Sequence, residues 1–200
     1  GSGDATPPAM VTKPQFRVLG IDDAPFSFRD AETEIVGVVV RAPSYVEGVM
    51  TSRVAVDGRD AATRLAAMIG RSRFRDNLAL VLLDGAALGG FNIVDLDALH
   101  SAIGLPVATV TGKEPDAGSM EKALRARFED ADERLEVLRR HKLSKIETAH
   151  KPLYVACVGM GIRDLAGAIR RCTVRGSIPE PLRIAHLVAT AIKKGESRGT

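Results

Sequence analysis

The sequence predicts a mixed α/β fold: an antiparallel three-strand meander followed by βαβα units, with helices on both faces of one sheet. Three β-rich runs follow one another closely in the first third of the chain, and the pattern then changes to alternating helical and strand segments. The 200 residues are 45% hydrophobic, which is enough to bury one core. We therefore expect a single domain over residues 15–195.

The first 14 residues are expected to lie outside that domain. Gly1-Ser2-Gly3 has the composition of a cloning remnant, and the stretch that follows is polar and contains prolines. This composition predicts a disordered N-terminus.

The meander accounts for the first three strands. They are expected over residues 16–21, 34–41 and 45–56. The second is β-branched nearly throughout, the third alternates apolar and polar residues, and Pro43 marks the turn between them. Strands joined by such short links pair antiparallel.

Helices enter after residue 57. Further strands are expected over 78–83, 105–110 and 153–158, with helices after the third strand, up to His100, over 119–141 and from Pro181 onward. Right-handed crossovers would place the fourth strand parallel to the first and beside it. That is the arrangement of a ribonuclease H-like mixed sheet, although the pattern alone leaves flavodoxin-like and Rossmann-like sheets open.

Two predicted strands end in acid. Asp22 and Asp23 follow the first strand, and Asp84 follows the fourth. Because these strands are expected to be neighbours, Asp22 and Asp84 should meet at one sheet edge, where their charges repel unless a proton or a cation intervenes. Carboxylate oxygens suit Mg²⁺ or Mn²⁺. The alternative is a turn-capping role, which is common for an Asp that precedes Gly.

The charge distribution favours a nucleic-acid partner. The net charge is only +3, but five arginines, Arg183 among them, lie within residues 163–183. Such a face suits a phosphate backbone. Low aromatic content, 4% with no Trp, argues against a platform that stacks single-stranded bases.

Other composition features limit the location and cofactor. Cys157 and Cys172 stand in apolar surroundings, which predicts reduced thiols and a cytoplasmic protein. No apolar stretch reaches the length of a membrane span. The Gly89-Gly90 turn lacks the dinucleotide and P-loop fingerprints, so no dinucleotide cofactor is expected.

Five motifs occur in a characteristic order. They are Val18-Leu19-Gly20-Ile21-Asp22-Asp23, Val56-Asp57-Gly58-Arg59-Asp60-Ala61, Leu83-Asp84-Gly85, Gly89-Gly90-Phe91-Asn92-Ile93-Val94-Asp95 and Ile178-Pro179-Glu180-Pro181-Leu182-Arg183-Ile184-Ala185-His186. With them the chain resembles a mainly archaeal, endonuclease V-like family over residues 16–190. Endonuclease V itself is a more remote relative: a ribonuclease H-like, metal-dependent nuclease that cuts beside inosine in DNA or RNA.

The resemblance implies roles for particular residues. Asp22 and Asp84 correspond to two metal-binding carboxylates of endonuclease V, and Asp60 to the third, with Asp57 close enough to compete. Lys113 stands where that enzyme has a lysine after the fifth strand. Met160 replaces the histidine of its Val-Gly-His run.

Several of these residues also have a simpler structural explanation. Asp60 fits equally well as an acid at a helix N-terminus, and Asn92 as the N-cap of the next helix, beside backbone amides that could bind phosphate. Lys113 is otherwise an exposed lysine. His186 lies in an apolar helical run and is expected to be a core histidine.

Together, these features predict a Mg²⁺- or Mn²⁺-dependent nuclease. Asp22, Asp60 and Asp84 would bind the metal and carry the chemistry, while Lys113, Asn92 and Arg183 would contact DNA or RNA. The alternative is a non-catalytic relative that kept the fold and binds nucleic acid or a protein.

Overall fold

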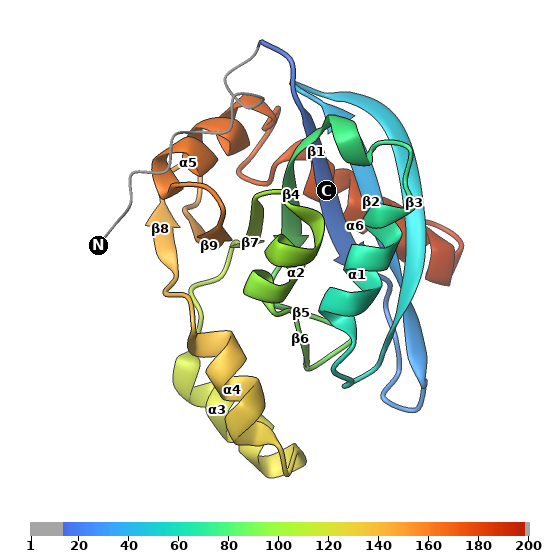
Figure 1. Ribbon diagram of the computed structural model, residues 1–200, viewed down its shortest axis with the longest axis vertical. Coiled ribbons are helices and arrows are strands. Elements are labelled where there is room, and N and C mark those ends of the chain that lie inside the picture. The colour runs from blue at the N-terminus through green and yellow to red at the C-terminus, as the bar shows by residue number, and fades with distance from the viewer. Residues whose placement is uncertain (1–13, 199–200) are drawn as a thin grey trace.

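A seven-stranded mixed sheet forms the centre of the computed structural model, which describes residues 14–198 (Figure 1). The strands are β1 (Arg17–Asp23), β2 (Glu32–Arg41), β3 (Tyr45–Ala55), β4 (Leu78–Asp84), β5 (Ala87–Leu88), β6 (Asn92–Ile93), β7 (Val107–Thr111), β8 (Ser144–Ile146) and β9 (Leu153–Val158). The order in the sheet is β3-β2-β1-β4-β7-β9-β8, and β5 pairs with β6 in a separate hairpin.

Helices cover both faces of the sheet (Figure 1). They are α1 (Ala61–Gly70), α2 (Leu96–Ile103), α3 (Ala117–Arg127), α4 (Ala131–Arg139), α5 (Ile162–Arg171) and α6 (Glu180–Lys194), with a short 3₁₀ turn, η2 (Arg75–Asn77). Among the residues described, none of these helices is long and apolar enough to cross a bilayer.

Alternation along β1 explains how one strand serves both layers. Val18 packs into the cluster that includes Leu165 of α5, whereas Leu19 and Ile21 pack into the cluster that includes Leu65 of α1. Successive side chains of a strand point to opposite faces, so both clusters can be apolar without interruption.

The predicted fold class is confirmed. β1, β2 and β3 pair antiparallel, and β4 is parallel to both β1 and β7. The antiparallel meander excludes the all-parallel order of the flavodoxin-like and Rossmann-like alternatives. The prediction for residues 1–14 lies outside the described residues, apart from Pro14.

The helix expected over residues 119–141 is two helices. The backbone is extended at Phe128, and α3 and α4 fold back on each other as a hairpin. The break lets Phe128 pack edge-on against Phe91, with ring centres 5.8 Å apart. It also lets Arg134 donate to the carbonyl oxygens of Gly58 and Phe91, at 3.1 and 2.9 Å. These long-range contacts outweigh the local helical pattern.

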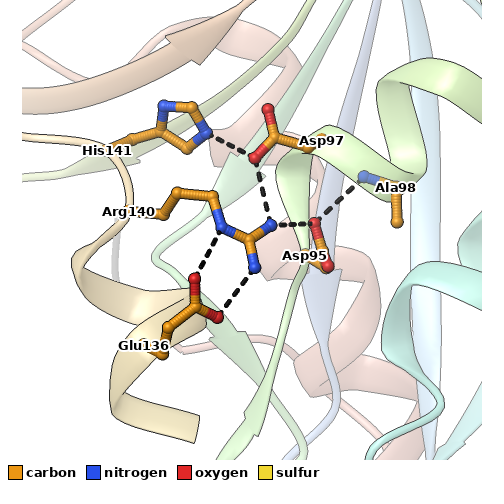
Figure 2. Close-up of polar contacts among 6 residues, drawn as sticks. All are labelled: Asp95, Asp97, Ala98, Glu136, Arg140 and His141. Carbon is orange, nitrogen blue, oxygen red and sulfur yellow. Dashed lines mark hydrogen bonds and ion pairs between the residues drawn. The ribbon is translucent and has the colours of Figure 1, made fainter. Parts of the chain in front are cut away.

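The α3–α4 hairpin is joined to α2 by an ion-pair network (Figure 2). Arg140 lies between Asp95 and Asp97 of the α2 N-terminus, 3.2 Å from an oxygen of each, and also pairs with Glu136 at 2.8 Å. His141 Nε2 lies 2.8 Å from Asp97 Oδ2. The N-cap of α2 is Asp95, not Asn92 as expected, because the β5–β6 hairpin occupies the preceding residues.

Candidate metal centre at the carboxyl edge of the sheet

Asp22, Asp84 and His186 form one group at the carboxyl edge of the sheet. Each offers one ligand atom, and these atoms all lie within 4.8 Å of one another. β1 and β4 are parallel neighbours with Ile21 opposite Leu83, so the next residue of each strand carries its carboxylate to the same place. By alternation both point toward the face that α6 covers.

A glycine sets the distance between α6 and β1. A Cβ at Gly20 would lie 2.3 Å from the carbonyl carbon and oxygen of Pro181 and 2.7 Å from the backbone nitrogen of Leu182. Only glycine therefore lets the start of α6 approach this closely. The helix then brings His186 Nδ1 to 3.0 Å from Asp22 Oδ2.

The expectation that His186 is a core histidine is wrong. Its side chain is 54% exposed, against 5% for Asp22. Leu182, Ala185 and Ala189 form the buried side of α6, and His186 lies next to that side, beside the acids. The only signal in the sequence was its position one and a half turns after Pro181. That position is informative only once Pro181 is known to contact Gly20.

The two carboxylates are held in an environment that disfavours their charge. Asp22 is buried, and its Oδ1 accepts a hydrogen bond from the backbone N–H of Asp23 at 2.8 Å. Burial, followed by the negative charges of Asp84 and Asp23, raises the pKa of Asp22 to about 9. Desolvation by surrounding atoms also raises the pKa of Asp84, although part of its carboxylate reaches solvent.

This donor set fits a divalent cation. A bound cation would replace the repulsion between Asp22 and Asp84 with attraction to both. Two carboxylate oxygens and one imidazole nitrogen are ligands that divalent transition metals accept. The group can therefore hold a metal with residues from β1, β4 and α6.

The structure does not bring Asp60 into this group. Its Oδ1 accepts from the backbone N–H of Ala55 at 3.1 Å and from Asn92 Nδ2 at 2.7 Å, and its Oδ2 lies 3.3 Å from Arg64 Nε. Asp60 is the residue that precedes α1. Asp60 was expected to be either a metal ligand or an acid at a helix N-terminus. These contacts match the second role, because they tie α1 to the end of β3.

Asn92 lies inside the fold. It is fully buried, its Oδ1 accepts from the N–H of Ala61 at 3.1 Å, and its Nδ2 also donates to the carbonyl of Ala55 at 2.9 Å. The amide thus satisfies the first turn of α1 rather than its own segment. Its side chain is therefore not available to nucleic acid.

Asp57 and Asp23 also make hydrogen bonds or ion pairs outside the acidic group. Asp57 has a positive φ of 56°, accepts from the N–H of Phe91 at 2.9 Å and pairs with Arg127 at 2.8 Å. Asp23 accepts from the N–H of Gly89 at 2.7 Å. Both hold the loop after β4 against the sheet.

Lys113 and Arg183 belong to segments that adjoin the acidic group: Lys113 follows β7, the neighbour of β4, and Arg183 is on α6, which carries His186. Lys113 is exposed two residues beyond β7 and, with Gly85 and Thr111, lines a cavity of about 640 Å³ between the sheet edge and the α3–α4 hairpin. Arg183, one turn before His186, makes a double contact with buried Glu180 at 2.7 and 2.8 Å. Its guanidinium is therefore held in place and partly neutralised.

Met160 is far from the acids in the sheet. β9 is antiparallel to β7 and ends with Val158 opposite Val107, whereas Asp84 lies opposite Val110. Met160 follows the end of β9 at Val158 and is buried in the hydrophobic cluster that includes Leu165 of α5. The histidine of this centre is therefore His186, from a different element.

Comparisons with known proteins agree on one family. A family model described as endonuclease dU matches residues 14–193. A UPF0215 protein of Methanothermobacter thermautotrophicus is 42% identical over 190 residues, covering 94% of this chain and 93% of that protein.

Solved structures agree on the fold. The crystal structure of a protein of unknown function from Archaeoglobus fulgidus has a TM-score of 0.82 and 32% identity, over 90% of this chain and 99% of that one. Ciona intestinalis endonuclease V, in complex with a 24mer DNA containing an inosine, has a TM-score of 0.56 and 15% identity, over 86% and 83%. At that identity the likeness concerns the fold alone.

Proposed function

The chain belongs to the endonuclease dU family, and from that membership and its acidic centre we propose that it is a divalent-metal-dependent nuclease that hydrolyses phosphodiester bonds in nucleic acid. The observation that carries the proposal is the convergence of Asp22, Asp84 and His186 at one sheet edge. A buried carboxylate beside a second one is costly in a protein that has no use for a cation there.

The residues of the group define the metal that we expect. Asp22 and Asp84 would supply oxygen ligands and His186 a nitrogen ligand. Mg²⁺ prefers oxygen ligands, whereas an imidazole is more readily accepted by Mn²⁺, so we propose Mn²⁺ as the better cofactor. When bound, such an ion acts as a Lewis acid and lowers the pKa of water.

The other residues position the substrate. Lys113 beyond β7 and Arg183 on α6 would supply positive charge for a phosphate backbone held over the acids. Asp22 holds the imidazole of His186 through Nδ1 and so orients the ring that solvent reaches. These roles are proposed by analogy with endonuclease V-like enzymes. Because the matching family is described as endonuclease dU, DNA that contains deoxyuridine is the first substrate to test.

An oligonucleotide cleavage assay tests the proposal. Single- and double-stranded oligonucleotides with deoxyuridine, with inosine or with neither would be incubated with Mn²⁺ or with EDTA. We expect the wild-type protein to cut at least one of them only with Mn²⁺. Asp84→Asn should slow cleavage by about a hundredfold or more, because it removes a charged ligand of the metal.

Asp132→Asn is the matched control, because this acid on α4 is 85% exposed and lies outside the group. It should cut at the wild-type rate. Cleavage that persists undiminished in Asp84→Asn contradicts the proposal. Metal-independent binding of these oligonucleotides without any cleavage would favour the non-catalytic alternative instead.

A further inference from the structure

We propose that a recess at the opposite end of the sheet binds a nucleotide through its terminal phosphate, either a free nucleoside monophosphate or the phosphorylated end of a strand. The recess has a volume of about 450 Å³. Its principal lining residues are Arg17, Arg41, Tyr45, Glu47, Arg73 and Phe74. This site is separate from the metal centre and goes beyond the proposed nuclease activity.

Strand pairing brings the residues of the recess together. Arg17 begins β1 and pairs with Arg41 at the end of β2, which in turn pairs with Tyr45 at the start of β3. Asp22 is five positions further along β1, and at a rise of about 3.3 Å per residue that is roughly 16 Å away. In Figure 1 the β2–β3 turn accordingly lies at the other end of the sheet from the β5–β6 hairpin.

The charges of the recess are unequal. Glu47 is the only acid among the residues that line it, and its carboxylate is shared by Arg17 Nε at 2.5 Å and Arg41 Nε at 2.7 Å. The hydrogen bond from Arg17 is the main cause that lowers the pKa of Glu47, and the charge of Arg73, a third cation that lines the recess, adds to it. In the described part of the chain no carboxylate lies within ion-pair distance of Arg73.

Three guanidinium groups against one carboxylate leave two positive charges on the recess. A terminal phosphate carries about −1.5 to −2 at neutral pH and so balances them. A phosphodiester within a strand carries a single negative charge and would leave one positive charge unmatched. The charge balance therefore favours a phosphomonoester over the backbone of a nucleic acid.

Aromatic rings hold the guanidinium groups and extend the site. Arg73 Cζ lies 4.3 Å from the centre of the Phe74 ring, and Arg41 Cζ lies 5.2 Å from that of Tyr45. A guanidinium that stacks on a ring keeps its N–H groups directed outward along its edge, where they can bind phosphate in pairs.

The two rings differ in packing and in exposure to solvent. Phe74 rests on the backbone of β3 at Gly48, where a Cβ would come within 2.4 Å of the ring. Tyr45 is 63% exposed, so much of its ring reaches solvent even though Arg41 lies over it. Base–aromatic stacking is tolerant of base identity. The recess thus suits a phosphate with a base attached, without a strong preference for one base.

Binding measured without metal tests the site apart from the nuclease proposal. In EDTA, fluorescence anisotropy would compare a decamer that carries a 5′-phosphate with the same decamer ending in a 5′-hydroxyl, and UMP would be added as a competitor. Either the phosphorylated decamer should bind about tenfold tighter than the hydroxyl form, or UMP should bind the protein directly. The first result identifies a strand end as the ligand, and the second a free nucleotide.

Arg73→Ala should reduce that phosphate-dependent binding by about tenfold or more. Arg75→Ala is the matched control, because Arg75 lies two residues away on η2 and does not line the recess. Asp84→Asn should also leave it unchanged. The proposal is overturned if neither probe shows binding that depends on Arg73, or if Arg75→Ala loses as much as Arg73→Ala.

Discussion

At the residue scale, the centre rests on two carboxylates that the fold holds close together, Asp22 buried and Asp84 at the surface. Asp22 is held by the N–H of Asp23 and by His186, and Asp84 adds a second charge from the neighbouring strand. Without a cation the pair is a source of instability. This makes the stability of the metal-free protein a direct readout of the site.

Asp22→Asn is expected to raise the Tm of the metal-free protein at pH 8 by about 2–4 °C or more, the shift that roughly 1 kcal/mol produces in a protein of this size. The pKa of Asp22 in the fold is about 9, above its ordinary value of 3.8. The folded state thus retains a proton that the unfolded chain releases, so the contribution of this group to stability declines as pH rises from about 4 to 9. The asparagine of Asp22→Asn has no carboxyl proton to lose, so the variant avoids this loss of stability at high pH.

Calorimetry across pH 4–9 checks this expectation. The Tm difference between variant and wild type should shrink toward pH 4. Asp97→Asn is a control for which the opposite change in Tm is expected. Burial raises the pKa of Asp97, but the hydrogen bonds from His141 and Arg140 together outweigh burial, so the pKa of this carboxyl is lowered. Removing the Asp97 carboxylate should therefore lower Tm slightly at neutral pH. A wild-type Tm at pH 8 equal to that of Asp22→Asn would contradict the account.

At the scale of elements, α6 is the helix that completes the centre. Its first turn contacts the backbone of β1 at Gly20, and its second carries His186 to Asp22. The glycine and the histidine are 166 positions apart in the chain and act as one structural unit. Any change that lifts α6 from β1 should therefore damage the fold and the centre together.

Gly20→Ala is expected to destabilise the fold by about 1–3 kcal/mol, since the added methyl group would meet backbone atoms that have no room to shift. It should also reduce the rise in Tm that Mn²⁺ causes, because His186 moves with α6. Gly167→Ala, on α5, is the matched control: nothing lies within 4 Å of its Cβ, and a gain of about 0.5–1 kcal/mol is expected. Urea unfolding with and without Mn²⁺ measures both. Equal stabilities for the two variants would show that the contact at Gly20 is not needed.

At the scale of the whole molecule, the sheet and the meeting of Asp22 with Asp84 could be predicted because both follow from strand periodicity and crossover handedness. His186 could not, since its partner lies 164 residues away and local pattern says nothing of that contact. The break at Phe128 was missed for the same reason. Asp60 and Asn92 were ambiguous in sequence, and only their hydrogen bonds show that they join α1 to β3 and β6.

Calorimetric titration with Mn²⁺ tests the central claim, that Asp22, Asp84 and His186 hold a divalent cation, most directly. The wild-type protein should bind Mn²⁺, and Asp84→Asn and His186→Ala should each weaken binding by about tenfold or more, or about 1.4 kcal/mol. Asp60→Asn should keep the wild-type affinity, because Asp60 is not part of the group. Unchanged affinity in Asp84→Asn, or no binding by the wild-type protein at millimolar Mn²⁺, would contradict the account.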